Sequence, residues 1–233
     1  MDQSAQPAEP KKLHTLATQR QVRTIRFSPD GNVLYGASYD GKIRRWDVKP
    51  PAAEEASLEE DKQKRQDNEM PAKELPLLEG HHGWVEQLIF APRHNLLLST
   101  DSWGQLCAWN VLKEPHDVKW RNETAHDGWL RAASLSADES LIATAGRDKI
   151  VRVWQTSDGK LLHELKGHAD EIFAVAIHPD NNSVISGDLF GRLKHWDLAS
   201  GSSERDGHLE KMHYYERDQD VAGLYSLRFE DDK

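Results

Sequence analysis

Short runs of alternating apolar and polar residues, separated by turn-forming residues, recur along most of the chain. One unit reads VRTIRF, SPDG, NVLYGAS, YDG and KIRRW in the stretch 22–46. Alternation over about six positions is typical of half-buried β-strands, and Asp-Gly dipeptides between such runs favour hairpin turns. The pattern therefore predicts short antiparallel strands joined by tight turns.

Tryptophan and histidine indicate that these strands belong to a repeat. Four tryptophans each end an apolar run, and three histidines keep step with the last three of them: Trp46, Trp109, Trp154 and Trp196, with His81, His126 and His168. The last three tryptophans are 45 and 42 residues apart, and so are the three histidines. Because two residue types share one period, the sequence predicts a structural repeat of about 40–45 residues.

Each repeat is expected to contain four strands. Apolar residues stand at matched positions of the first strand in four repeats and in a fifth copy: Val22, Ile25, Phe27; Val85, Leu88, Phe90; Leu130, Ala133, Leu135; Ile172, Val175, Ile177; and Leu224, Leu227, Phe229. The second strands are VLYGAS, LLLST, LIATA and VISG, the third are KIRRW, QLCAW, IVRVW and RLKHW, and the outer strands are ELPLLE, DVKWRNE, LLHELK and MHYYE. Short strands at a fixed period indicate an all-β repeat fold.

The spacing of a Gly-His dipeptide, a strand pair and a Trp-Asp dipeptide resembles the WD-repeat family of β-propellers. Gly-His occurs at 80–81 and 167–168 and Trp-Asp at 46–47 and 196–197, while Asn110 and Gln155 replace the aspartate in the other repeats. The resemblance implies a partial propeller of four four-stranded antiparallel blades plus one extra strand, an incomplete ring. The expected bounds are a disordered N-terminus at 1–10 and a propeller at 11–233, with blade 1 at about 19–79, blade 2 at about 84–123, blade 3 at about 129–166, blade 4 at about 171–216 and the start of blade 5 at about 221–233.

The resemblance also implies a buried hydrogen-bond tetrad in each blade. Only repeat three has all four members at the family's positions: His126, Thr144, Asp148 and Trp154. In repeat one, Thr18 and Gly36 replace the histidine and the hydroxyl residue. In repeats two and four, Trp103 and Phe190 stand where the turn aspartate is expected. Because a partly satisfied buried network is costly, we expect these two sites to be repacked with aromatic contacts.

Residues 49–74 interrupt the period with a charged insertion. Trp109 follows Trp46 by 63 residues, about 21 more than the shortest spacing of the repeat. The segment is dense in charge and poor in apolar residues, which is typical of a solvated helix or a disordered loop. A partner-binding segment is the alternative.

The repeats present are too few to close a ring. Residues 11–18 resemble the outer strand with which this family completes its last blade, and the sequence ends at the first turn of a fifth blade. Family propellers most often have seven blades, and an open arc leaves unpaired strand edges. We therefore expect a fragment or a shortened product of a longer chain, and closure by a second copy, as a homodimer, is the alternative.

Composition and charge limit the classes of function. The chain has 233 residues, a formal net charge of −9 and one cysteine, Cys107. Net acidity disfavours nucleic acid as the main partner, because that affinity depends on clustered Lys and Arg. A single cysteine forms no internal disulfide, and the sequence has neither a signal peptide nor an apolar stretch of about 18 residues. These features favour a cytoplasmic protein without a membrane segment.

No catalytic, metal or cofactor motif is present in the sequence. HExxH, CxxC, a Walker loop and the GxSxG elbow are all missing, and the twelve histidines are explained mainly as anchors of the repeat. We therefore assign no catalytic residue, no metal site and no cofactor.

The resemblance places a partner-binding surface, the upper face, at the start of each first strand and at the turn between the second and third strands. Its candidate residues are Arg23, Tyr39, Trp84, Glu86, Trp129, Arg131, Arg147, Phe173 and Tyr225. Aromatic residues and arginine dominate interface hot spots, so we predict a non-enzymatic scaffold that binds a protein or peptide there.

Three alternatives to this binding surface remain open. In the first alternative, Trp84 and Trp129 only cap the central channel of the propeller by packing against neighbouring blades. The second alternative is a propeller enzyme with Glu86 and Glu171 at its channel mouth. The third is binding of nucleic acid or a phosphopeptide through arginines 23, 131 and 147.

Overall fold

The computed structural model describes residues 16, 18, 20–49, 72–111, 114–200 and 203–208. The strands in these ranges form four antiparallel sheets of four strands each, and within each sheet the strands follow one another in sequence order. Each sheet is one blade. The nearly all-β architecture predicted from the repeat is therefore confirmed, with one 3-10 turn at Pro92–His94 besides the strands of the described part.

The strand bounds of the four blades are as follows. Blade 1 contains β1 (Val22–Phe27), β2 (Val33–Ser38), β3 (Ile43–Asp47) and β4 (Lys73–Leu78). Blade 2 contains β5 (Val85–Ala91), β6 (Leu96–Asp101), β7 (Leu106–Asn110) and β8 (Asp117–Asn122). Blade 3 contains β9 (Leu130–Leu135), β10 (Leu141–Gly146), β11 (Ile150–Gln155) and β12 (Leu161–Lys166). Blade 4 contains β13 (Ile172–Ile177), β14 (Ser183–Asp188), β15 (Arg192–Asp197) and β16 (Ser203–His208).

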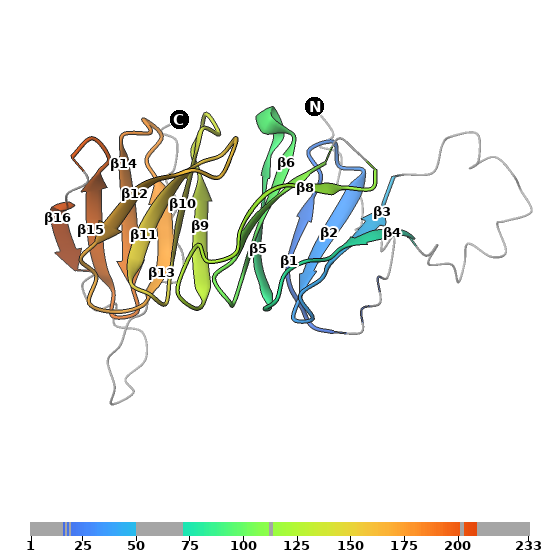
Figure 1. The fold of residues 1–233 in the computed structure, drawn as a ribbon, viewed down its shortest axis with the longest axis horizontal. Coiled ribbons are helices and arrows are strands. Elements are labelled where there is room, and N and C mark those ends of the chain that lie inside the picture. Colours follow the sequence, from blue (N-terminus) through green and yellow to red (C-terminus); the bar gives the residue numbers. More distant parts are fainter. Residues whose placement is uncertain are drawn as a thin grey trace, which may run out of the picture.

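The blades stand side by side in a row, from blade 1 in blue to blade 4 in orange and red (Figure 1). The first strands β1, β5, β9 and β13 contact one another in turn, so each blade meets the next through its inner strand. Within the described residues, blades 1 and 4 lie at the two ends of this row (Figure 1).

The hydrophobic core lies between neighbouring blades rather than inside one sheet. Ile43 of blade 1 packs with Leu88 and Trp109 of blade 2, and equivalent clusters join blade 2 to blade 3 and blade 3 to blade 4. A sheet covered on both faces needs apolar residues on both faces, which explains the nearly continuous apolar runs of strands such as β6.

Two predicted boundaries differ from the structure. Lys73 and Glu74 lie in β4, paired with Asp47 and Trp46, so the insertion ends before residue 73 instead of at 74. The outer strand of blade 4 is β16, at 203–208, and not MHYYE at 212–216. The carboxylate of Asp197 accepts the backbone N–H groups of Ala199 and Ser200, which turns the chain directly after β15.

Several expectations lie outside the described residues. They concern the N-terminus at 1–10, most of the strand predicted at 11–18, most of the charged insertion, and the start of blade 5 at 221–233 with Tyr225. Among the described residues, no helix combines the length and the apolar character needed to cross a bilayer.

Candidate binding surface

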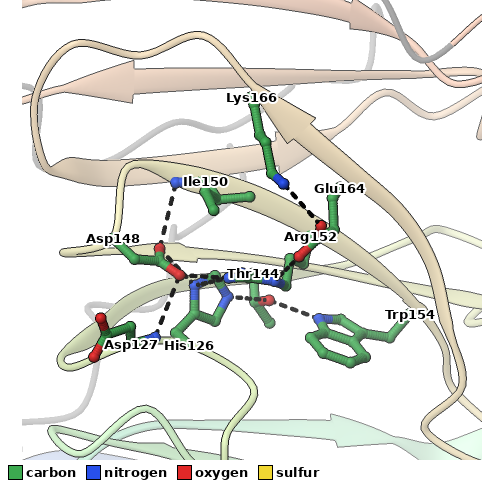
Figure 2. Close-up of polar contacts among 9 residues, drawn as sticks. All are labelled: His126, Asp127, Thr144, Asp148, Ile150, Arg152, Trp154, Glu164 and Lys166. Atoms are coloured by element: carbon green, nitrogen blue, oxygen red, sulfur yellow. Dashed lines mark hydrogen bonds and ion pairs between the residues drawn. The ribbon is translucent and has the colours of Figure 1, made fainter.

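A chain of buried hydrogen bonds links strands β10 and β11 of blade 3 to the loop before β9 (Figure 2). Trp154 Nε1 donates to Thr144 Oγ1 at 2.7 Å, and His126 Nε2 lies 2.8 Å from the same oxygen. His126 Nδ1 lies 2.9 Å from Asp148 Oδ1. Satisfying all three contacts places a proton on Nδ1 and leaves Nε2 to accept from the threonine hydroxyl. The loop is thereby fixed to the blade.

Blades 2 and 4 have the same tetrad, and our expectation that aromatic contacts replace it is wrong. His81 Nδ1 lies 3.0 Å from Asp101 Oδ2 and its Nε2 lies 2.6 Å from Ser99 Oγ, which accepts from Trp109 Nε1 at 2.8 Å. The equivalent members in blade 4 are His168, Asp188, Ser186 and Trp196. The described blades therefore contain three tetrads, where we expected one.

In the tetrads of blades 2 and 4, the aspartate stands at a different sequence offset from the hydroxyl residue than it does in blade 3. Asp101 follows Ser99 by two residues and ends β6, whereas Asp148 follows Thr144 by four. Its other oxygen, Oδ1, accepts the backbone N–H groups of Trp103 and Gln105, so the carboxylate closes the turn from its first residue. The signal was present in the sequence as a serine followed two positions later by an aspartate, in both repeats.

Blade 1 lacks the tetrad and is tied to blade 2 by a buried arginine instead. A Cβ at Gly36 would lie 2.9 Å from Trp46 Cζ3, so the indole occupies the space of the missing hydroxyl side chain. The side chain of Arg45 is fully buried, and its guanidinium donates to both carboxylate oxygens of Glu114 at 2.6 and 3.0 Å. It also donates to the carbonyl of Pro76 at 2.8 Å.

The tetrads make stability depend on pH. Burial lowers the pKa of His126 and of His168, so both are neutral in the native state at neutral pH. Burial raises the pKa of Asp148, but hydrogen bonds from His126 and Arg152 outweigh it and leave that pKa below the usual range. The native state thus holds neutral histidines beside ionised carboxylates.

We expect the free energy of unfolding to fall as the pH drops below about 6.5, where histidines of the unfolded chain take up protons that the native His126 and His168 do not. Each histidine contributes at most about 1.4 kcal/mol per pH unit. The carboxylates add a further loss only below about pH 4. Urea unfolding between pH 7.5 and 5.0 measures the slope, and His126→Gln should reduce it. If the free energy of unfolding does not change between pH 7.5 and pH 5.0, His126 and His168 are not neutral in the native state.

A β-bulge at the start of every first strand leaves one residue of each blade outside the regular strand pairing. The strand registers skip a residue after Val22, after Val85 and after Ile172, and the pairing of β9 with β10 shifts at the same place. The skipped residues are Arg23, Glu86, Arg131 and Phe173, all of them candidates for the upper face. Bulges often redirect a side chain next to a functional site.

Ion pairs join these positions across blade boundaries. Arg23 Nε donates to Glu86 Oε2 at 3.0 Å, from blade 1 to blade 2. Arg131 lies 3.3 Å and Arg147 3.7 Å from the carboxylate of Glu171, from blade 3 to the start of blade 4. Each of the three candidate arginines therefore already faces a carboxylate of this chain.

Aromatic rings and one guanidinium form a continuous series of contacts over the same positions. The ring centroids of Tyr39 and Trp84 are 4.8 Å apart, and those of Trp84 and Trp129 are 5.6 Å apart. The guanidinium carbon of Arg131 lies 4.0 Å from the ring centre of Trp129 and 4.5 Å from that of Phe173. This series of contacts, the upper-face ladder, crosses all four blades.

Two pockets lie along the upper-face ladder. The first, of about 450 Å³, is lined by Tyr39, Asp40, Gly41, His82, Gly83, Trp84, Ser102, Trp103 and Trp129. The second, of about 300 Å³, is lined by Arg23, Glu86, Gln87, Arg131 and Phe173. Sequence reasoning left His82 out of the upper face, and it missed Trp103 because it assigned position 103 to the tetrad.

Candidate groups for chemistry are few in the described part of the chain. No three His, Cys, Asp or Glu side chains gather there as metal ligands. Burial raises the pKa of the Cys107 thiol to about 11, which keeps it protonated and unreactive. Glu86 and Glu171 are both paired with arginine.

Comparison with known proteins agrees with this geometry. The WD domain, G-beta repeat family matches the chain four times, at residues 10–47, 72–110, 120–155 and 159–197. The chain belongs to the WD-repeat family. The matches at 72–110 and 159–197 each begin with the outer strand of one blade and end with the third strand of the next.

Similar curated proteins share parts of their length with this chain. Apoptotic protease-activating factor 1 of Rattus norvegicus is 25% identical over 78% of this chain and 13% of its own length. Nuclear distribution protein PAC1-2 of Uncinocarpus reesii is 26% identical over 83% of this chain and 43% of its own length. Small ribosomal subunit protein RACK1 of Drosophila melanogaster is 31% identical over 52% of this chain and 37% of its own length. The chain thus spans less than half of these relatives.

A solved structure has the same fold. A chain in a crystal structure of a mitotic checkpoint complex superposes with a TM-score of 0.64 over 84% of this chain and 53% of its own length, at 20% identity. Proteins of the WD-repeat family are generally protein-interaction scaffolds, and they are typically not enzymes.

Proposed function

We propose that this chain is a non-enzymatic scaffold that binds a protein or a peptide on its upper face. The observation that carries the proposal is the upper-face ladder. It brings the residue types that dominate interface hot spots, Trp, Tyr and Arg, into one surface that crosses four blades. Because its members support one another, little side-chain entropy is lost when a partner binds.

Exposure supports binding over simple capping of the channel. Trp84 packs between Tyr39 and Trp129 and still leaves 45% of its surface exposed. In the second pocket, Glu86 is buried and its Oε1 has no hydrogen-bond partner among the described residues. A partner's N–H or O–H group is a suitable donor for that oxygen, because an unsatisfied buried acceptor is costly.

The geometry lends less support to the other two functions. Arg23, Arg131 and Arg147 each face a carboxylate, which reduces their attraction for phosphate groups. No convergent pair of acids stands out for an enzyme, because Glu86 and Glu171 are held by different arginines. We therefore keep a protein or peptide as the proposed ligand.

The double substitution Trp84→Ala with Trp129→Ala is expected to weaken the affinity for captured proteins at least about tenfold, since each substitution removes a hot-spot ring. The full chain is immobilised, and captured proteins are quantified by mass spectrometry and then titrated individually. The matched control is Leu161→Ala with Leu162→Ala, which removes two exposed apolar side chains of β12, away from the upper face. If the double variant keeps the wild-type circular dichroism spectrum and its binding is unchanged, the proposal is wrong.

A further inference from the structure

A pocket away from the upper face lies between blades 1 and 2, at the end of the blades where the first strands finish. Apolar side chains of both blades line it: Val33 and Tyr35 of blade 1, and Phe90, Leu96 and Val111 of blade 2. The ring centroids of Tyr35 and Phe90 lie 5.1 Å apart, edge to face. This lower-face pocket, of about 340 Å³, is large enough for one apolar side chain and a short piece of peptide backbone.

The corresponding seam between blades 2 and 3 is closed by direct contacts. The backbone N–H of Arg93 donates to the carboxylate of Glu139 at 2.7 Å, and its guanidinium donates to the carbonyl of Asp138 at 3.3 Å. These bonds tie the two turns together. Between blades 1 and 2, residues of the equivalent turns at 28–31 and 92–95 border the pocket instead. The pocket therefore distinguishes this seam from the next one.

The core between blades 1 and 2 reaches the surface at this pocket. Val33, Phe90 and Val111 pack against the buried cluster that joins the two blades, and all three are only partly buried. Tyr35 and Leu96, which also line the pocket, are each 3% exposed. Covering the remaining apolar surface with a partner's side chain is favourable, because it removes that surface from water.

Hydrogen bonds hold the polar wall of the pocket in place before a ligand arrives. His116 Nε2 lies 2.8 Å from the guanidinium of Arg45 and 2.9 Å from the hydroxyl of Tyr35. Because arginine can only donate, this nitrogen is an acceptor. Arg45 also holds both carboxylate oxygens of Glu114. A wall fixed in this way loses little entropy when a ligand binds.

The charge at the rim of the pocket selects the partner. The lining includes the carboxylates of Asp30 and Glu114 and no Lys or Arg. Glu114 is paired with the buried Arg45, whereas Asp30 accepts hydrogen bonds from the neutral groups of Ser28 and Asn32. These bonds lower the pKa of Asp30 to about 2, so its carboxylate is ionised at neutral pH. Its charge is therefore complementary to a cation of a partner.

We propose that the lower-face pocket is a second binding site, for an extended peptide segment in which leucine or phenylalanine stands two positions from a lysine or arginine. Side chains two positions apart lie on the same side of an extended chain, so the apolar one fills the pocket while the cation lies against Asp30. An acidic segment is disfavoured, since no basic side chain lines the pocket and the chain has a net charge of −9. This site goes beyond the proposed function, because it lies at the other end of the blades from the upper face.

The test titrates short peptides into the full chain while the backbone amide signals of Val33, Asn95 and Val111 are followed by NMR. The probes are Nα-acetyl-Leu-Gly-Lys methylamide and its Phe-Gly-Lys counterpart. Each is compared with a peptide that has glutamine in place of lysine and with one that has alanine in place of the apolar residue. We expect alanine to weaken binding at least about tenfold and glutamine about twofold or more. The tighter of the two probes identifies the preferred apolar side chain.

Asp30→Asn is expected to abolish the preference for lysine over glutamine, because it removes the charge and keeps an acceptor oxygen in the turn. The matched control is Asp138→Asn, at the same turn position of blade 3. Asp138 accepts hydrogen bonds from Ser136 and Ser140 in a similar way and does not line the pocket, so the preference should remain.

Three results overturn the proposal. One is that the alanine peptide binds as tightly as the leucine and phenylalanine peptides, or that none of them shifts the pocket signals. Another is a lysine preference that survives Asp30→Asn. The third is loss of peptide binding in the Trp84→Ala, Trp129→Ala variant, which leaves the lower-face pocket unchanged, because the peptides then bind the upper face. Peptide binding that persists in this variant while captured proteins are lost supports both sites.

Discussion

Thr144→Val is expected to lower the free energy of unfolding by about 2–6 kcal/mol, although it changes the side-chain shape very little. The hydroxyl of Thr144 is fully buried and serves two groups at once, since it accepts from Trp154 Nε1 and contacts His126 Nε2. Valine leaves both nitrogens without a partner, and each buried unsatisfied group costs about 1–3 kcal/mol. Urea unfolding followed by circular dichroism measures the loss.

Thr144→Ser is the control, because it keeps the hydroxyl and removes only a methyl group. We expect it to cost about 1 kcal/mol, the value for one buried methyl group. Blades 2 and 4 carry serine at this position, as Ser99 and Ser186. If valine and serine destabilise the chain equally, the hydrogen-bond chain contributes nothing beyond packing, and the role given to the tetrads is wrong.

Gly104→Ala is expected to destabilise the chain by roughly 2–5 kcal/mol, because two separate costs coincide at this turn of blade 2. Gly104 has a φ of +86°, a conformation that side chains with a Cβ rarely adopt. A Cβ there would also overlap the carbonyl oxygens of His126 and Gly128, at the approach of blade 3. The backbone N–H of His126 donates to the Gly104 carbonyl at 3.0 Å, so the two loops cannot simply separate.

Gly31→Ala isolates the conformational part of this cost. Gly31 has a φ of +73°, but a Cβ at that position meets no atom within 4 Å. We expect a loss of about 1 kcal/mol, due to the positive φ alone. The difference between the two alanine variants, measured by the same urea unfolding, reports the close approach of blades 2 and 3. Equal losses at the two glycines argue against that approach.

Local patterns were sufficient to predict the first three strands of each described blade. The alternation and the repeat period placed the first three strands of every blade, because short turns join these strands and keep their spacing nearly constant. The outer strand of blade 4 was misplaced at 212–216, since an outer strand has one neighbour in its sheet and its pattern is weak. The turn that decides its position depends on the carboxylate of Asp197.

The tetrads illustrate a limit of position-by-position reasoning. Matching residues by position found Asp148 but not Asp101 and Asp188, which reach the histidine from two residues earlier in the chain. A hydrogen bond requires an oxygen at the right place in space, and different sequence offsets can bring it there.

The sequence by itself determined the family, the repeat period and the residue types of the upper face, because these depend on local alternation and on markers at fixed spacing. The tertiary structure decided which of those residues meet. The pairing of each candidate arginine with a carboxylate of another blade and the edge contact of Trp84 with Trp129 both join residues of different blades. Such contacts depend on how blades pack against one another, and the period of a sequence does not contain that packing.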